Sequence, residues 1–156
     1  MVDLNEGRKV AKGIEGLKLV RIYRDESRIF MDFGKKYNDN EKNIKYTLGV
    51  ISIWRLKTNK VVLGARDIFV PASSKNKENF DWKVIGDTKF DEKVSDINKN
   101  LDDIGKVSLF DIDDSGDIVI TFENGYIFET CVVTSIKDVE WWIEKQSTEK
   151  FYVYYE

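Results

Sequence analysis

VSLFDIDDSGDIVITFENGYIFETCVV, residues 107–133, predicts three antiparallel strands joined by two tight turns. Apolar and polar side chains alternate on both sides of Asn124-Gly125, a dipeptide that tolerates the positive φ angles of a two-residue hairpin turn. With that turn, Ile120 lies opposite Glu129. The hairpin then has one apolar face that carries a single carboxylate, that of Glu129.

Glu129 is a candidate binding residue with two interpretations. On an apolar floor, its carboxyl group would have a raised pKa and could serve as a general acid or base. Alternatively, it lies at the rim of the face or pairs with a nearby Lys or Arg, because Glu is rarely buried without a partner. We expect the second arrangement.

Residues 111–117, DIDDSGD, resemble the beginning of an EF-hand calcium loop, with Asp111, Asp113 and Asp117 at positions one, three and seven. The twelfth position, which should hold a bidentate Glu, is Phe122, and the flanking residues predict strands instead of helices. The same residues are typical of an Asp/Ser/Gly turn between strands. We therefore expect a turn without a metal. In the alternative, a calcium-binding loop, the three Asp residues would be the calcium ligands.

The composition argues against catalysis. The 156 residues include no histidine, which excludes histidine metal sites and Ser-His or Cys-His nucleophile pairs. An enzyme would have to use carboxylates, Lys, Tyr or Arg, as carboxylate-pair glycosidases do. We lean against an enzyme and expect no cofactor. The length predicts a single domain over residues 1–156, and the formal charge of −3 argues against a nucleic-acid partner.

Cys131 is the single cysteine, so the chain forms no internal disulfide and no thiolate zinc site. It falls in an apolar strand, where we expect a small buried side chain. The first twenty residues are too charged for a signal peptide, and no apolar run approaches the ~18 residues of a membrane span. These features predict a cytoplasmic protein without a membrane partner.

Residues 88–104 predict the main amphipathic helix. Its apolar face steps by three and four residues through Phe90, Val94, Ile97, Leu101 and Ile104. Thr88 and Asp91 form a capping-box pattern at its start, and Gly105 is a natural stop.

The opposite face of this helix carries the exposed acidic residues Asp96, Asp102 and Asp103. Asp102 and Asp103 fall at the end of the helix where the dipole disfavours negative charge. This acidic end is a candidate surface for a basic protein partner. A solvated helix face without a partner is the more common situation for such charges.

Further strands are predicted at residues 17–24, 28–33, 46–56, 139–143 and 151–155. Trp54 and Arg55, within 46–56, form a candidate binding pair because an exposed aromatic beside a guanidinium can stack on a base or a sugar. Alternatively, Trp54 lies in the core and Arg55 extends to solvent. Residues 151–155, FYVYY, have aromatics on both sides, which indicates an inner strand or an edge used for homo-oligomer formation.

Four short motifs follow one another along the chain: Trp54-Arg55, Phe90-Asp91, Phe122-Glu123-Asn124-Gly125 and Trp141-Trp142. Their order resembles that of small bacterial proteins without an assigned activity. Some of these look like immunity proteins, which neutralise a toxin by binding it. The resemblance implies a protein-binding role and assigns no catalytic residue.

Together these patterns predict an α+β fold with a strongly bent antiparallel β-sheet and one main helix at about 88–104, a closed barrel being the alternative. The predicted function is a non-enzymatic protein-binding module, with toxin neutralisation as one form of it. The alternative is a carboxylate-based enzyme or a calcium- or carbohydrate-binding domain that uses Glu129, the 111–117 turn and the tryptophans.

Overall fold

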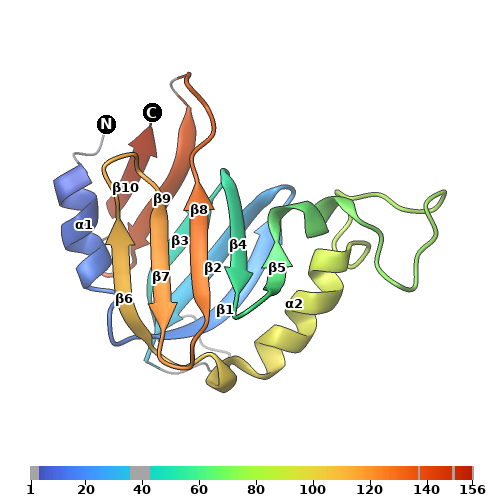
Figure 1. Cartoon of the computed structure of the whole chain (residues 1–156), viewed down its shortest axis with the longest axis horizontal. Coiled ribbons are helices and arrows are strands. Elements are labelled where there is room, and N and C mark those ends of the chain that lie inside the picture. Colours follow the sequence, from blue (N-terminus) through green and yellow to red (C-terminus); the bar gives the residue numbers. More distant parts are fainter. Residues whose placement is uncertain (1–3, 36–42, 137, 149, 156) are drawn as a thin grey trace.

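Two antiparallel sheets pack face to face in the computed structural model, which describes residues 4–35, 43–136, 138–148 and 150–155 (Figure 1). Sheet A contains, from edge to edge, β1 (Lys18–Asp25), β2 (Arg28–Gly34), β3 (Ile44–Val50), β9 (Val139–Lys145) and β10 (Lys150–Tyr155). Sheet B contains, in the same way, β5 (Val61–Gly64), β4 (Ile53–Lys57), β8 (Ile127–Cys131), β7 (Ile118–Phe122) and β6 (Val107–Ile112). The predicted α+β class is confirmed, and the described parts of the two sheets do not close into a barrel.

The chain bends from one sheet into the other at two places. The chain leaves sheet A between β3 and β4 and returns to it between β8 and β9. At this corner the backbone N–H groups of Ile51 and Ser52 both donate to the carbonyl of Glu140, at 2.9 and 3.2 Å. Pairing therefore continues through the bend, which is how a sandwich turns a corner. This arrangement is the strongly bent sheet that the sequence predicts, and it splits the expected strand 46–56 into β3 and β4.

The core fills the space between the sheets. Fully buried side chains come from both layers, including Phe33, Leu48, Trp141 and Ile143 of sheet A and Leu56, Phe110, Ile120 and Phe128 of sheet B. Trp141 also connects the layers, because its indole N–H donates to the carbonyl of Gly116, in the β6–β7 turn, at 2.8 Å. Side chains that point the other way on each strand face outward.

Two helices lie at the flanks of the sandwich (Figure 1). The first, α1 (Leu4–Lys12), packs against β6, β9 and β10. The second, α2 (Lys89–Lys99), packs against β1, β5 and the 3-10 turn η2 (Ala65–Phe69). Neither helix covers the front of sheet B in Figure 1. The outer face of this sheet is therefore open.

The main helix begins where the sequence predicts and ends earlier. The capping box is formed: the Thr88 hydroxyl accepts the Asp91 N–H at 3.1 Å, and the Asp91 carboxylate accepts the Thr88 N–H at 3.2 Å. At the other end, the Asn100 N–H bonds to Ile97, three residues back, which tightens the last turn. The predicted range 88–104 therefore consists of α2 followed by a 3-10 turn, η3 (Leu101–Asp103).

The β7–β8 hairpin has a three-residue loop instead of the expected two-residue turn. The Phe122 N–H donates to the carbonyl of Tyr126 at 2.9 Å, and the Gly125 N–H donates back to Phe122 at 3.2 Å. Gly125 has a φ of 85°, and the positive-φ residues do not include Asn124. This is a type I turn closed by glycine, the usual three-residue solution. The pairing register consequently differs from the prediction by one residue.

That shift turns β8 over, because a slip of one residue moves every side chain to the opposite face. Ile120 lies opposite Phe128, and Val119 lies opposite Glu129. Phe128 is buried in the core, and Cys131 is exposed. The predictions of a buried Cys131 and of Glu129 on the apolar face were therefore wrong.

Candidate functional site

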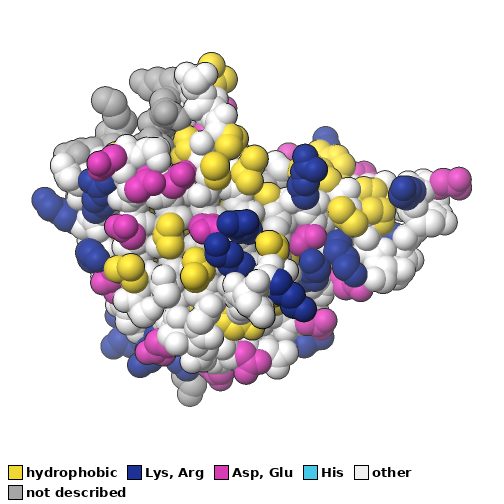
Figure 2. Space-filling model, in the orientation of Figure 1, with side chains coloured by type: hydrophobic (Ala, Val, Ile, Leu, Met, Phe, Trp, Pro, Cys, Tyr) yellow, Lys and Arg dark blue, Asp and Glu magenta, His cyan; other side chains and the backbone are white. Residues whose placement is uncertain are grey.

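The outer face of sheet B carries apolar side chains that neither α1 nor α2 covers. Alternation along each strand points Leu109 of β6, Val119 of β7, Ile53 of β4 and Val61 of β5 outward, with 44, 37, 55 and 51% of each residue exposed. Figure 2 shows apolar side chains on this face around a central group of Lys and Arg side chains. Exposed apolar groups over neighbouring strands mark an interaction surface more often than isolated ones do.

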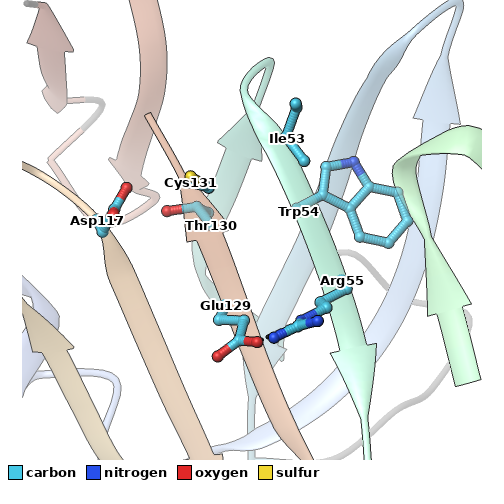
Figure 3. Close-up of a pocket in the computed structure, with 7 residues that line it drawn as sticks. All are labelled: Ile53, Trp54, Arg55, Asp117, Glu129, Thr130 and Cys131. Carbon is cyan, nitrogen blue, oxygen red and sulfur yellow. Dashed lines mark hydrogen bonds and ion pairs between the residues drawn. The ribbon is translucent and has the colours of Figure 1, made fainter. Parts of the chain in front are cut away.

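A cluster of three charges lies at the centre of this face. Arg55 on β4 stands directly opposite Glu129 on β8 in the strand register. The Arg55 guanidinium forms a hydrogen-bonded ion pair with the Glu129 carboxylate (Figure 3). Lys57, two residues along β4, contacts the same carboxylate oxygen at 2.8 Å. Within this cluster, two cations therefore share one anion.

These contacts determine the ionisation of Glu129. The hydrogen bond from Lys57 and, after it, the one from Arg55 hold the pKa of the Glu129 carboxyl group below its ordinary value, although partial burial opposes them. The raised pKa of the general-acid interpretation was therefore wrong. Pairing with nearby cations, the arrangement that the sequence favours, is what the structure shows. Lys57 is the member of this cluster that the sequence analysis missed.

An open depression of about 400 Å³ lies beside the charge cluster. Its lining residues are Ile53, Trp54, Arg55, Asp117, Glu129, Thr130 and Cys131 (Figure 3). Two of its polar groups bind backbone: the Asp117 carboxylate accepts the Val132 N–H at 2.6 Å, and the Thr130 hydroxyl accepts the Ile118 N–H at 2.8 Å. The remaining lining residues are the Arg55–Glu129 ion pair, Cys131 with its thiol, and the apolar Ile53 and Trp54. They suit contact with a partner surface.

Trp54 belongs to the core. The residue is 4% exposed, and its ring lies edge-on to Phe90 at 5.9 Å and stacks on Phe128 at 6.0 Å between centroids. Arg55, the next residue, is exposed on the opposite face of the strand. The two residues of the candidate pair therefore lie on opposite faces of β4. Arg55 is accessible to a ligand, and the ring of Trp54 is buried.

The acidic residues of the helix end are exposed. The Asp96 and Asp102 side chains are 80 and 89% accessible, and their nearest cations are Lys99 at 3.8 Å and Lys18 at 3.0 Å. Asp103 is also exposed, and its carbonyl accepts the side-chain amide of Asn124, in the β7–β8 loop, at 3.1 Å. The acidic end thus lies beside that loop, as a surface distinct from the Arg55–Glu129 cluster.

One carboxylate, that of Asp113, holds the 111–117 turn together. Asp113 accepts the Ser115 hydroxyl at 2.7 Å, the Ser115 N–H at 2.8 Å and the Asp117 N–H at 3.0 Å. The Ser115 hydroxyl is the largest reason why the pKa of Asp113 lies below its ordinary value. Asp111 is exposed on β6. Within the described residues, no three Asp, Glu or Cys side chains gather as metal ligands would.

No protein-family model, curated protein or solved structure matches the chain. Among the described residues, neither helix has the length and apolar composition needed to cross a membrane. The function is therefore inferred from the surfaces themselves.

Replacing Glu129 with glutamine tests the charge cluster. Because the carboxylate is partly exposed, we expect a loss of up to about 1 kcal/mol in the free energy of unfolding at pH 7. The pKa is lower in the folded state, so this contribution is complete above the ordinary value of 4.5 and disappears as the pH falls through the folded pKa. Urea unfolding at several pH values measures it, with the same change at the exposed loop residue Glu78 as control. A difference that grows at acid pH would contradict the assignment.

Proposed function

We propose that this chain is a protein-binding domain and that the outer face of sheet B is its contact surface. The observation that carries the proposal is the set of apolar side chains exposed across neighbouring strands, among them Ile53, Val119 and Leu109, around the Arg55–Glu129 pair. Protein interfaces combine an apolar patch with arginine and a polar rim in this way. The depression is too open to enclose a small molecule as ligand pockets do.

The charges indicate what such a partner presents. Arg55 and Lys57 both contact the carboxylate of Glu129, so this cluster has two cations for one anion, while Asp117, the other carboxylate that lines the depression, accepts the Val132 N–H. A partner with apolar side chains around a central carboxylate would complement it. The proposed partner is therefore a folded protein with an acidic group inside an apolar patch.

Toxin neutralisation is the second candidate function. It is supported by the high exposure of Asp96 and Asp102, together with the resemblance of the short motifs to immunity proteins. In this version a basic partner contacts the acidic end of α2. The unpaired, exposed thiol of Cys131 supports a reducing compartment such as the bacterial cytoplasm for either version.

Self-association is a further alternative. The predicted strand 151–155 is confirmed as β10, which forms an edge of sheet A. The backbone of an edge strand can pair with a second copy, and this supports the alternative. The side chains of residues 150, 151 and 153–155 lie outside the described set. Light scattering at several protein concentrations distinguishes self-association from a monomer, because a dimer would double the measured mass.

A comparison of two surface variants in a pull-down from the source cells tests the proposal. Ile53→Lys with Val119→Lys places charge on the outer face of sheet B, and both sites are exposed, so we expect stability to change by less than about 0.5 kcal/mol. The wild type should retain a partner protein at about one copy per chain. We expect the amount of this partner retained by the double variant to be lower by a factor of about ten or more.

The matched variant reverses charge at Asp96, Asp102 and Asp103. If the proposal is right, it retains the partner. The opposite result is that the acidic-end variant loses the partner and the sheet B variant retains it. In that case toxin neutralisation, with a basic partner bound at the acidic end of α2, replaces the proposal.

A further inference from the structure

We propose that the outer face of sheet A holds a second binding site, which takes a sugar ring of a neutral oligosaccharide. Two parallel rows of side chains form the site. In the strand register, Tyr23, Phe30, Gly49 and Trp142 lie side by side across β1, β2, β3 and β9. The neighbouring row consists of Arg21, Asp32, Thr47 and Glu144. An aromatic row and a polar row therefore share one face of four adjacent strands.

The aromatic row is continuous. The rings of Tyr23 and Phe30 stack at 4.9 Å with an interplanar angle of 11°, and Phe30 meets Trp142 edge to face at 5.6 Å and 77°. The ring of Trp142 fills the space over Gly49, where an added Cβ would lie 2.2 Å from two of its carbons. A glycine in the third strand is thus what lets the row cross the sheet. All three aromatic residues are partly exposed.

The polar row is fixed in place by a buried carboxylate. Asp32 is 1% exposed, and one of its oxygens accepts both Nε and Nη2 of Arg21, at 2.9 and 2.7 Å. Its other oxygen accepts the Thr47 hydroxyl at 2.7 Å. The Arg21 guanidinium also lies 4.3 Å above the Tyr23 ring, which ties the polar row to the aromatic row. Preorganised polar groups of this kind lower the cost of binding.

The polar row borders a depression of about 200 Å³, together with the Tyr23 and Phe30 end of the aromatic row. Ile44 and Gln146 complete its lining, and Trp142 extends the aromatic surface beyond it. A cavity of roughly 150 Å³ accepts benzene, so this volume suits about one six-membered ring with substituents. Sugar hydroxyls both donate and accept hydrogen bonds, and the site offers the Glu144 carboxylate as acceptor, the Arg21 guanidinium as donor and the Gln146 amide as both. The C–H face of a sugar ring can pack on the aromatic row.

The charge of the rows selects against phosphate. Asp32 and Glu144 outnumber Arg21, and phosphate recognition needs a cationic surface. Stacking of nucleic-acid bases on the same rings is therefore disfavoured. The site lies on the opposite sheet from the proposed protein-binding face and does not depend on that proposal.

Binding to an array of neutral oligosaccharides, followed by calorimetric titration of the best binder, tests the site. We expect saturable binding that Glu144→Gln weakens by about tenfold, the factor typical of one charge-assisted hydrogen bond. Trp142→Leu should weaken it as well. Glu129→Gln, the same chemical change on the outer face of sheet B, should leave it unaltered.

Three results would overturn the inference. These are no binding to any saccharide, saccharide binding that neither Glu144→Gln nor Trp142→Leu weakens, and binding of a single-stranded oligonucleotide in place of a saccharide. Circular dichroism of each variant shows whether it is folded. If Trp142→Leu is unfolded, Glu144→Gln decides the matter, because the ring-to-ring contacts of the aromatic row do not involve its side chain.

Discussion

Replacing Arg24 with methionine is expected to lower the free energy of unfolding by about 3–5 kcal/mol, the cost of breaking a buried ion pair from one side. The Arg24 side chain is 1% accessible and makes five hydrogen bonds. Two go to the Asp91 carboxylate, each at 2.7 Å. The others go to the carbonyls of Glu26, Trp82 and Val84. One side chain thus joins β1, the start of α2 and the loop before it.

Removing the guanidinium takes away the only cation paired with the Asp91 carboxylate among the described residues, which keeps the donors of Gly86 and Thr88, and removes one donor from each of three carbonyls. Urea unfolding of Arg24→Met measures the loss, and Arg28→Met is the matched control because Arg28 pairs with Asp25 at the surface. We expect less than about 1 kcal/mol for the control. Equal losses in the two variants would contradict the role assigned to Arg24.

The same ion pair predicts a pH dependence. Burial favours the neutral form of Asp91, but the hydrogen bonds from Arg24, Gly86 and Thr88 outweigh it, and the pKa of Asp91 lies below the ordinary 3.8. Its stabilisation is therefore complete at neutral pH and is lost as the pH falls through the folded value. The wild type should lose stability at acid pH more steeply than Asp91→Asn.

Replacing Trp141 with alanine is expected to cost about 3–5 kcal/mol, as large-to-small changes of buried aromatics do. Trp141 is fully buried, and its indole N–H donates to the Gly116 carbonyl across the two sheets. Trp141→Phe keeps part of the packing and loses the hydrogen bond, so its cost should be smaller. Its neighbour Trp142 lies on the outer face of sheet A, and Trp142→Phe is the control.

Chemical unfolding followed by circular dichroism gives all three values. We expect the order Trp141→Ala, Trp141→Phe and Trp142→Phe, from the largest loss to the smallest. A loss for Trp142→Phe as large as that for Trp141→Ala would mean that the outer face of sheet A, and not the core, holds the layers together.

The sequence predicted helices and strands correctly where the pattern depends on residues close together in the chain. The capping box at Thr88 and the apolar spacing of the main helix are confirmed, because both depend on residues three or four positions apart. The hairpin was predicted with the wrong register. Asn124-Gly125 favours a two-residue turn, and the loop formed has three residues with a positive φ at Gly125. The order of residues alone does not distinguish these two solutions.

The surfaces depended on that register. A shift of one residue exposed Cys131 and moved Glu129 onto the outer face beside Arg55, which is 74 residues away in the chain. The rows on sheet A were missed for a related reason. Arg21, Asp32 and Glu144 alternate with apolar residues on their own strands, but their meeting follows from the order of the strands in the sheet.

The central claim is that the outer face of sheet B binds a protein. The reactivity of Cys131 tests this claim most directly. Cys131 is the single cysteine of the chain, is exposed and lines the depression beside the Arg55–Glu129 pair. The measurement is the rate at which a small maleimide alkylates this thiol, in the purified protein and in the complex isolated from the source cells. We predict at least about tenfold slower alkylation in the complex, because packed interface cores exclude water and solutes. An equal rate in a complex that contains a stoichiometric partner would contradict the claim and place the contact on another surface.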